Sequence, residues 1–329
     1  MDFAYANVSG ELANYKGKTV TQLGYTATTS AINVEAMEDL GGGLKAQARY
    51  ELDPRALASD GGALGRHQAF IALSGGFGTV RLGAPNSLGL RAFLATSPLG
   101  TGIGSGYAPG GNNTGATNLV TTRWSRSMQY TSPTVSGFSA SATFAPGVDE
   151  TVAPANNASA NGIPLGRAAT ELGLNYSNGP LNLVYVNIQN GEFKNGATNG
   201  ATATANSQKT TANVFGANYT MGAATLYAAY MDGDLKMATG SVATAPVEIK
   251  GYRLAAKYNM GTVDLIGSYQ QAEIQSGAAK GMKDKITGLR ADYNLSKRTA
   301  VYAGFENWNG TAATADTRKV TSIGVRHSF

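Results

Sequence analysis

The sequence predicts an all-β chain in which sixteen antiparallel strands close into a barrel that spans a membrane. Three observations predict this fold class. Apolar and polar residues alternate with period two along many segments, which is typical of strands with one apolar face. These segments run about ten to twelve residues, whereas strands of soluble proteins usually have five or six. Tight turns alternate along the chain with long polar connections, as they do at the two rims of a transmembrane barrel.

The composition excludes several other classes of protein. The chain has 329 residues, of which 43 are glycine and only 14% are charged, so intrinsic disorder is not expected. It has no cysteine, which excludes disulfides and thiolate metal sites. No apolar run reaches the roughly 18 residues of a membrane-spanning helix. The first residues, MDFAYANVSG, lack a basic start and an apolar core, so we expect a mature form without a signal peptide.

Two segments illustrate the alternation. GLKAQARYEL (residues 43–52) places leucine, alanine and tyrosine on one face and Lys45, Gln47, Arg49 and Glu51 on the other. YRLAAKYN (residues 252–259) separates Tyr252, Leu254, Ala256 and Tyr258 from Arg253 and Lys257 in the same way. The sixteen expected strands span residues 2–11, 22–38, 43–53, 65–75, 77–84, 121–132, 136–146, 167–178, 180–190, 209–221, 223–233, 248–260, 262–273, 284–295, 298–308 and 318–329. An even number lets the last strand pair antiparallel with the first and leaves no open edge.

Alternation alone is also compatible with a soluble sandwich or an adhesin, because any half-buried sheet alternates. Two further features favour the membrane barrel. No shift of composition marks a domain boundary, so we expect a single domain over residues 1–329. Tyrosine recurs near the ends of the expected strands, where a transmembrane barrel carries its aromatic girdles.

The pattern of charge predicts a basic pore and no catalysis. The two histidines, His67 and His327, are far apart in sequence, and no nucleophile, acid and base set or metal-ligand spacing can be assembled. We therefore expect no enzyme activity, no cofactor and no metal. No acidic residue occurs between Asp60 and Asp149, a span that contains five arginines. Because a lipid-facing arginine near mid-bilayer costs about 2–4 kcal/mol, strand phase places most basic side chains inside the barrel. The expected pore-lining residues are Lys45, Arg49, Glu51, Arg66, Arg81, Arg91, Arg123, Arg253, Lys257, Arg290 and Arg326.

Several stretches resemble one known family. EDLGGGLKAQARYEL, LSGGFGTVRLG, RWSRSMQYTSPTVSGFSASATF, DYNLSKRTAVYAG and the closing GVRHSF resemble the sixteen-stranded general porins of Gram-negative outer membranes, in particular the beta-proteobacterial type. The first strand departs from the apolar opening that is usual in that family. The resemblance implies a homotrimer of water-filled pores in the bacterial outer membrane. It also implies that the third outer loop, about residues 84–120, folds inward and narrows each pore.

This third loop carries apolar residues that favour an ordered structure, and it departs from the family in its charges. It has no carboxylate and contributes Arg91, so Glu51 on the wall is the best candidate for an acid at the narrowing. A basic constriction raises the local concentration of anions. The sequence therefore predicts a channel for passive diffusion of small hydrophilic solutes that prefers anions. A substrate-selective channel for organic-acid or phosphate-like anions is the alternative, and a barrel adhesin is a third possibility.

The closing segment TSIGVRHSF alternates up to the last residue. Ile323, Val325, His327 and Phe329 form an outward stripe, while Arg326 faces inward. A terminal phenylalanine in this context resembles the signal by which the barrel-assembly machinery recognises such proteins. The expected partners are two further copies of the chain, outer-membrane lipid including lipopolysaccharide, the assembly machinery, and small anions and solutes. No nucleic acid is expected.

Overall fold

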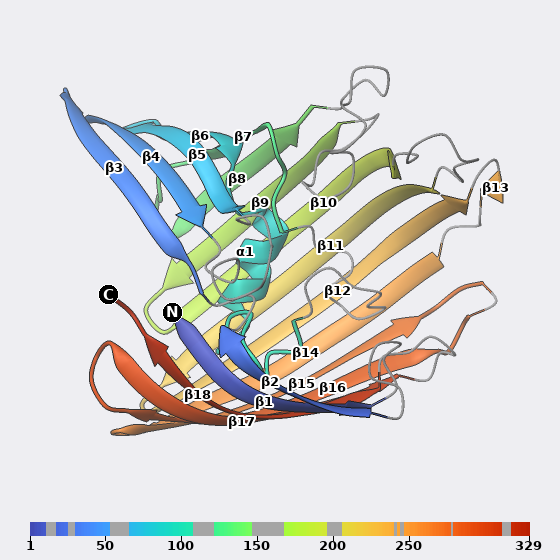
Figure 1. Ribbon diagram of the computed structural model, residues 1–329. Coiled ribbons are helices and arrows are strands. Elements are labelled where there is room, and N and C mark those ends of the chain that lie inside the picture. Colours follow the sequence, from blue (N-terminus) through green and yellow to red (C-terminus); the bar gives the residue numbers. More distant parts are fainter. Residues whose placement is uncertain are drawn as a thin grey trace.

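In the described residues, all the strands belong to a single antiparallel sheet that surrounds one short helix (Figure 1). The computed structural model describes residues 1–10, 18–25, 30–52, 66–107, 122–146, 168–195, 206–239, 242–243, 247–277, 279–310 and 317–329. Within these residues, no helix is both long and apolar enough to span a membrane.

The strands follow one another along the chain with a single helix between the sixth and the seventh. They are β1 (Asp2–Gly10), β2 (Lys18–Tyr25), β3 (Ile32–Gly41), β4 (Leu44–Leu52), β5 (Arg66–Gly75), β6 (Gly78–Ala84), β7 (Ser127–Thr131), β8 (Phe138–Ala145), β9 (Ala169–Asn178), β10 (Leu181–Asn195), β11 (Asn206–Met221), β12 (Ala224–Thr239), β13 (Val242–Ala243), β14 (Val247–Met260), β15 (Val263–Ile274), β16 (Lys283–Asn294), β17 (Thr299–Gly310) and β18 (Arg318–His327). The helix is α1 (Leu88–Ala95).

These eighteen segments correspond to the sixteen expected strands. The strand expected at residues 22–38 is interrupted, and its two parts are β2, which pairs with β1, and β3, which pairs with β4. The two-residue β13 pairs only with the end of β12, which also pairs directly with β14. The predicted fold class, a sixteen-stranded antiparallel barrel, is therefore confirmed.

The first and last strands close the sheet. β1 pairs with β18 over its whole length, from Asp2 opposite Arg326 to Gly10 opposite Arg318, and pairs with β2 on its other edge. Antiparallel pairing continues without interruption from β3 through β18 to β1 and β2. Pairing within the sheet gives hydrogen-bond partners to both edges of β1 and of β4 to β12, which is the condition for a β-structure in lipid, while among the described residues β2 pairs only with β1 and β3 only with β4.

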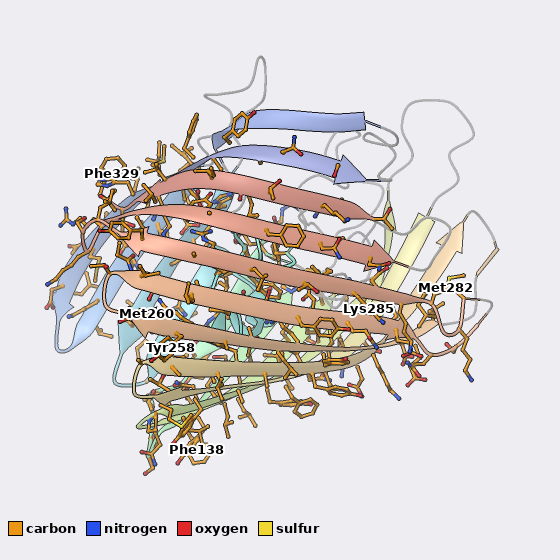
Figure 2. All side chains as sticks on the ribbon, turned by 90° about the horizontal axis from the view of Figure 1, so that it is seen from below. Phe138, Tyr258, Met260, Met282, Lys285 and Phe329 are labelled. Carbon is orange, nitrogen blue, oxygen red and sulfur yellow. The ribbon has the colours of Figure 1, made fainter. Side chains whose placement is uncertain are left out.

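The strands alternate as the sequence predicts. Side chains on the outer face are mostly apolar and exposed, and side chains on the inner face are mostly buried. On β14, Tyr252 and Leu254 are exposed on the outer face, while Gly251 and Arg253 are buried on the inner face. β18 alternates in the same way, and Ile323 and Val325 are exposed outward. The two ends of the barrel can be followed in Figure 2, where Phe138, Tyr258, Met260 and Phe329 lie toward one end and Met282 and Lys285 toward the other.

The strand expected at residues 121–132 is shorter than predicted. β7 begins only at Ser127, because Arg126 has a left-handed backbone with φ of 58° that breaks the alternation. Arg123 therefore does not lie on a barrel strand, as its phase had indicated, but forms an isolated antiparallel bridge with Asn86.

Helix α1 lies inside the barrel and contacts β8 to β11 (Figure 1). Ser87 caps it, since its Oγ accepts a hydrogen bond from the Leu90 N–H at 2.9 Å. Leu88 and Ala92 are buried in one apolar cluster with inward residues of five neighbouring strands, Val186, Ile188, Ala212, Val214, Met231, Ile249, Ala272 and Ile274. This part of the wall is apolar on its inner face because the helix, rather than water, covers it.

The chain that follows α1 comes very close to β16. A Cβ atom added to Gly288 would lie 1.8 Å from the carbonyl oxygen of Gly104, so only glycine allows this approach.

We predict that Gly288→Ala forces the two backbones apart and lowers the free energy of unfolding by about 1–3 kcal/mol. Gly267→Ala on neighbouring β15 is the matched control, because its added Cβ would lie 3.6 Å from the Leu289 side chain, an ordinary contact. Urea unfolding of the refolded barrel measures both. Equal stability of the two variants would show that the close approach does not constrain the fold.

Candidate functional site

The site is built around an inner segment, residues 86–107, which enters the barrel after β6 and follows its wall. Side chains of several wall strands hold the backbone of this segment, and three of these side chains are charged anchors. Glu171 on β9 is the first, and its carboxylate accepts hydrogen bonds from the N–H groups of Leu88 at 2.7 Å and Gly89 at 3.4 Å. It is only 1% exposed. A carboxylate at this position satisfies free N–H groups of α1 and complements the positive end of the helix dipole.

Arg253 on β14 is the second anchor, and it binds the other end of the helix. Its guanidinium donates to the carbonyl oxygens of Phe93 at 3.0 Å and Thr96 at 3.2 Å, and to the Thr96 hydroxyl. It also lies 4.0 Å from the centre of the Phe93 ring. The amide of Asn218 donates to the Ala95 carbonyl at 2.8 Å. A cation here gives the Thr96 carbonyl its donor, adds a donor to the Phe93 carbonyl that already accepts from the Thr96 N–H, and complements the negative end of the helix dipole.

Glu306 on β17 is the third anchor. Its carboxylate accepts from the N–H groups of Gly104 at 2.8 Å and Gly106 at 3.1 Å, and from the Trp308 indole. Ser268 and Gln270 on β15 donate to the carbonyl oxygens of the same two glycines, at 2.6 and 2.8 Å. The inner segment therefore lines the wall from β9 to β17.

Two arginines, Arg81 and Arg91, lie close together near the start of the inner segment, and a third, Arg123, bridges to its first residue, Asn86; we call the three the basic cluster. Arg81 on β6 donates to the Thr131 hydroxyl at 3.4 Å and lies 5.9 Å from the centre of the Phe70 ring. Arg91 projects from the exposed side of α1, and its charge repels that of Arg81. Arg123 interacts electrostatically with Glu51 and with Tyr107.

The surroundings of Arg91 and Arg123 lower the pKa of both guanidinium groups, but both groups stay charged. Removal of water lowers the pKa of Arg91, and Glu171 partly offsets this by raising it. Burial lowers the pKa of Arg123 in the same way, while Glu51 and Tyr107 raise it. Arginine nevertheless stays protonated in proteins at neutral pH. Within the part of the chain that the structure describes, Arg81, Arg91 and Arg123 form no ion pair within 4.0 Å.

Most carboxylates of the inner face are, in contrast, buried and bonded, while Glu35 stays exposed and pairs with Arg49. Six of them are at most 7% exposed. Each accepts a hydrogen bond from the wall or the inner segment. They are Asp2, Glu51, Glu171, Asp264, Asp292 and Glu306. In the described residues no group of three acidic or histidine side chains could hold a metal ion.

Three expected pore-lining residues, Lys45, Arg49 and Lys257, lie on the inner face with part of the side chain exposed. Arg49 bonds to Glu35 at 3.1 Å and to Glu51 at 2.5 Å. Lys257 pairs with Asp264 at 3.0 Å, and Lys45 is exposed next to the turn after β3. Glu51 itself is held by Arg49 and by the amide and backbone N–H of Gln68. The side chain of Arg66 lies outside the described residues.

For two arginines the expectation that they line the pore is wrong. Arg253 is 4% exposed, because α1 covers it. Arg290 is also 4% exposed, since it bonds to Asp292 at 2.5 Å and stacks 3.6 Å from the centre of the Tyr302 ring. Arg326 forms an ion pair with the same Asp292 at 3.2 Å, but its side chain stays 43% exposed.

Sequence reasoning missed the anchoring roles of Glu171 and Glu306. Strand phase does place both on the inner face, but phase cannot tell a side chain that faces water from one that holds a loop. The cap residue Ser87 and the apolar run after it could have indicated the helix, and a helix N-terminus inside a barrel needs an acceptor on the wall.

We predict that Arg253→Met releases the C-terminal end of α1, because the buried Thr96 carbonyl loses its donor at a cost of about 1–3 kcal/mol, while the Phe93 carbonyl keeps the Thr96 N–H. A spin label on Leu94→Cys reports the motion, and the chain has no other cysteine. The label should become more mobile in Arg253→Met and stay unchanged in Arg326→Met. An unchanged spectrum in both would show that Arg253 does not hold the helix.

Comparison with known proteins agrees with this architecture. A family model described as Gram-negative porin matches residues 1–313. Outer membrane porin protein 32 of Delftia acidovorans is 28% identical over 92% of this chain and 85% of its own length. The major outer membrane protein P.IB of Neisseria lactamica is 27% identical over 91% of this chain and 83% of its own.

Solved structures show the same fold. The anion-selective porin from Comamonas acidovorans superposes with a TM-score of 0.78 at 24% identity, covering 100% of this chain and 97% of that one. Outer-membrane expressed OmpT of Vibrio cholerae superposes with a TM-score of 0.72 at 14% identity, covering 100% of this chain and 95% of that one. The chain therefore belongs to the Gram-negative porin family, and it is an outer-membrane channel for passive diffusion rather than an enzyme.

Proposed function

We propose that this porin prefers anions to cations. The observation that carries the proposal is the difference between the two signs of charge on the inner face. Six carboxylates are buried and bonded, whereas Arg81, Arg91 and Arg123 have no ion-pair partner among the described residues. The charge that solutes meet in the lumen is therefore basic.

Such a lumen raises the local concentration of anions, because low-dielectric walls focus the field of charges that line a narrow polar passage. The inner segment, as part of a third loop at about residues 84–120, narrows the lumen and brings Arg91 toward Arg81. Small hydrophilic solutes and inorganic anions are then the proposed cargo of a single barrel domain. The name of the Comamonas protein, an anion-selective porin, is consistent with this proposal.

We predict that Arg81→Glu lowers the ratio of chloride to potassium permeability by a factor of about five, which corresponds to about 1 kcal/mol for a unit charge near 4 Å in water. The reversal potential of the refolded pore under a KCl gradient measures the ratio. Lys250→Glu is the matched control, because it makes the same change of charge on the outer face of β14.

An equal shift in the two variants would show that net charge rather than the position of Arg81 sets selectivity. Conductance that saturates with an organic acid or phosphate, and is blocked by it, would favour a substrate-selective channel instead.

The last residue is proposed to act in assembly. Phe329 is 91% exposed, and its ring lies against that of His327, at 4.6 Å between centroids. The pairing of β18 with β1 does not include it. The barrel-assembly machinery would bind this exposed end of the last strand.

Deletion of Phe329 should therefore reduce the amount of porin in the outer membrane of cells several-fold, while pores refolded in vitro keep their conductance. Quantitative immunoblots of outer membranes and planar-bilayer recordings measure the two effects. An equal loss in both assays would show that Phe329 stabilises the barrel itself.

The native assembly is proposed to be a homotrimer embedded in outer-membrane lipid, including lipopolysaccharide. One of the structural neighbours, OmpT of Vibrio cholerae, is described in a trimer form. Conductance steps in groups of three would support a trimer of this chain.

A further inference from the structure

The inner segment joins the wall of the barrel through a short neck, in which two stretches of the chain pair with each other. Asn86 and Arg123 form an antiparallel bridge there, and the N–H of Ser87 donates to the carbonyl oxygen of Thr122 at 2.9 Å. We call these four residues the neck. Arg123 also belongs to the basic cluster, so the position of its guanidinium depends on the contacts that fix the neck.

One side chain, that of Gln68 on β5, connects the neck to the carboxylate of Glu51 on β4. Its amide nitrogen donates to Glu51 Oε1 at 2.8 Å, and its amide oxygen accepts from the Asn86 N–H at 3.0 Å. The backbone N–H of Gln68 donates to the other carboxylate oxygen, Glu51 Oε2, at 3.1 Å. Gln68 therefore binds an acid of the wall and, at the same time, the residue that pairs with Arg123.

Glu51 attracts Arg123, but the two side chains do not meet. The charge of Glu51 acts on the Arg123 guanidinium. In the part of the chain that the structure describes, Arg123 nevertheless has no ion-pair partner within 4.0 Å. Its Nε is buried and has no hydrogen-bond partner among the described residues. The attraction is thus present, while the contact that it favours is not formed.

The contact is not formed because other donors occupy the oxygens of Glu51. Oε1 accepts from the Arg49 guanidinium at 2.5 and 2.9 Å and from the Gln68 amide, and Oε2 accepts from the Gln68 N–H. Arg49 is shared, because it also pairs with Glu35 at 3.1 Å. Of these donors, the Gln68 side chain is the one that also bonds the neck, so it fixes the distance between the carboxylate and Arg123.

A glutamine suits this position because an amide offers both a donor and an acceptor and carries no charge. Lysine or arginine could donate to Glu51 but could not accept from the Asn86 N–H. Glutamate could accept from Asn86 but would repel Glu51. Glutamine therefore holds the acid and the neck together without adding a charge to the lumen.

We propose that Gln68 is a positioning residue for anion selectivity. It holds Glu51 beside Arg49 and away from Arg123, so that the Arg123 guanidinium keeps donors free for anions. The inference rests on the proposed anion preference, and it adds the residue that keeps one of the three arginines of the basic cluster unpaired.

Gln68→Met tests the proposal, because it removes both side-chain bonds, keeps the length of the side chain and lets Glu51 turn to Arg123. The ratio of chloride to potassium permeability should fall by a factor of about two to three, less than the effect of a full unit charge near 4 Å in water. The reversal potential of the refolded pore under a KCl gradient measures the ratio. Gln47→Met is the matched control, because Gln47 also donates to a carboxylate, at 2.9 Å, but to that of Glu35. It should keep the ratio of the unchanged porin.

A double-mutant cycle with Glu51→Gln separates this role from a general disturbance of the neck. In the Glu51→Gln background, Gln68→Met should leave the ratio unchanged, because the carboxylate that would pair with Arg123 is gone. A fall of the same size in both backgrounds would show that Gln68 acts through the neck alone, and would overturn the proposal. Gln68→Ala removes the same two bonds with less bulk and should give the same result in the cycle.

The ratio of the unchanged porin separates this proposal from the proposed function. If the unchanged porin prefers anions and Gln68→Met has the same ratio, the role of Gln68 is wrong and the proposed function stands. If the unchanged porin prefers cations, both are overturned. A single-channel conductance of the variants close to that of the unchanged porin shows that they fold.

Discussion

Every backbone N–H and C=O group inside this barrel needs a hydrogen-bond partner, and this constraint decides most of the structure. The strands meet it by closing on themselves through β18 and β1. The inner segment has no sheet to join, so its free N–H and carbonyl groups must bind the wall. Glu171 and Arg253 bind the two ends of α1, and Glu306 binds the backbone of Gly104 and Gly106.

The electrostatics of the lumen follow from this anchoring. Two of the wall carboxylates, Glu171 and Glu306, are buried because they hold the inner segment, and others are buried in pairs such as Asp292 with Arg290. Carboxylates bound in this way are buried and make no direct contact with a solute in the pore. Arg81 and Arg91 have no such partner among the described residues, so the same contacts that position the segment leave the lumen basic.

The sequence alone predicted the barrel well, because period-two alternation and the sequence of short and long connections depend only on local chemistry. It predicted the inward direction of Arg253 and Arg290 but not their burial, because burial depends on what the inner segment and Tyr302 cover. It placed Arg123 on a strand, since nothing in the sequence indicates the left-handed conformation of Arg126. Strand phase therefore gives the face of a residue but not its neighbours.

The central claim is that free charge in the lumen is positive because the inner-face acids are occupied. Anomalous diffraction from crystals soaked in rubidium bromide tests it most directly, since both ions can be located in one experiment. We predict ordered bromide beside Arg81, Arg91 and Arg123 and no ordered rubidium on Glu171 or Glu306. Rubidium bound to either of these carboxylates, with no bromide at the arginines, would contradict the account.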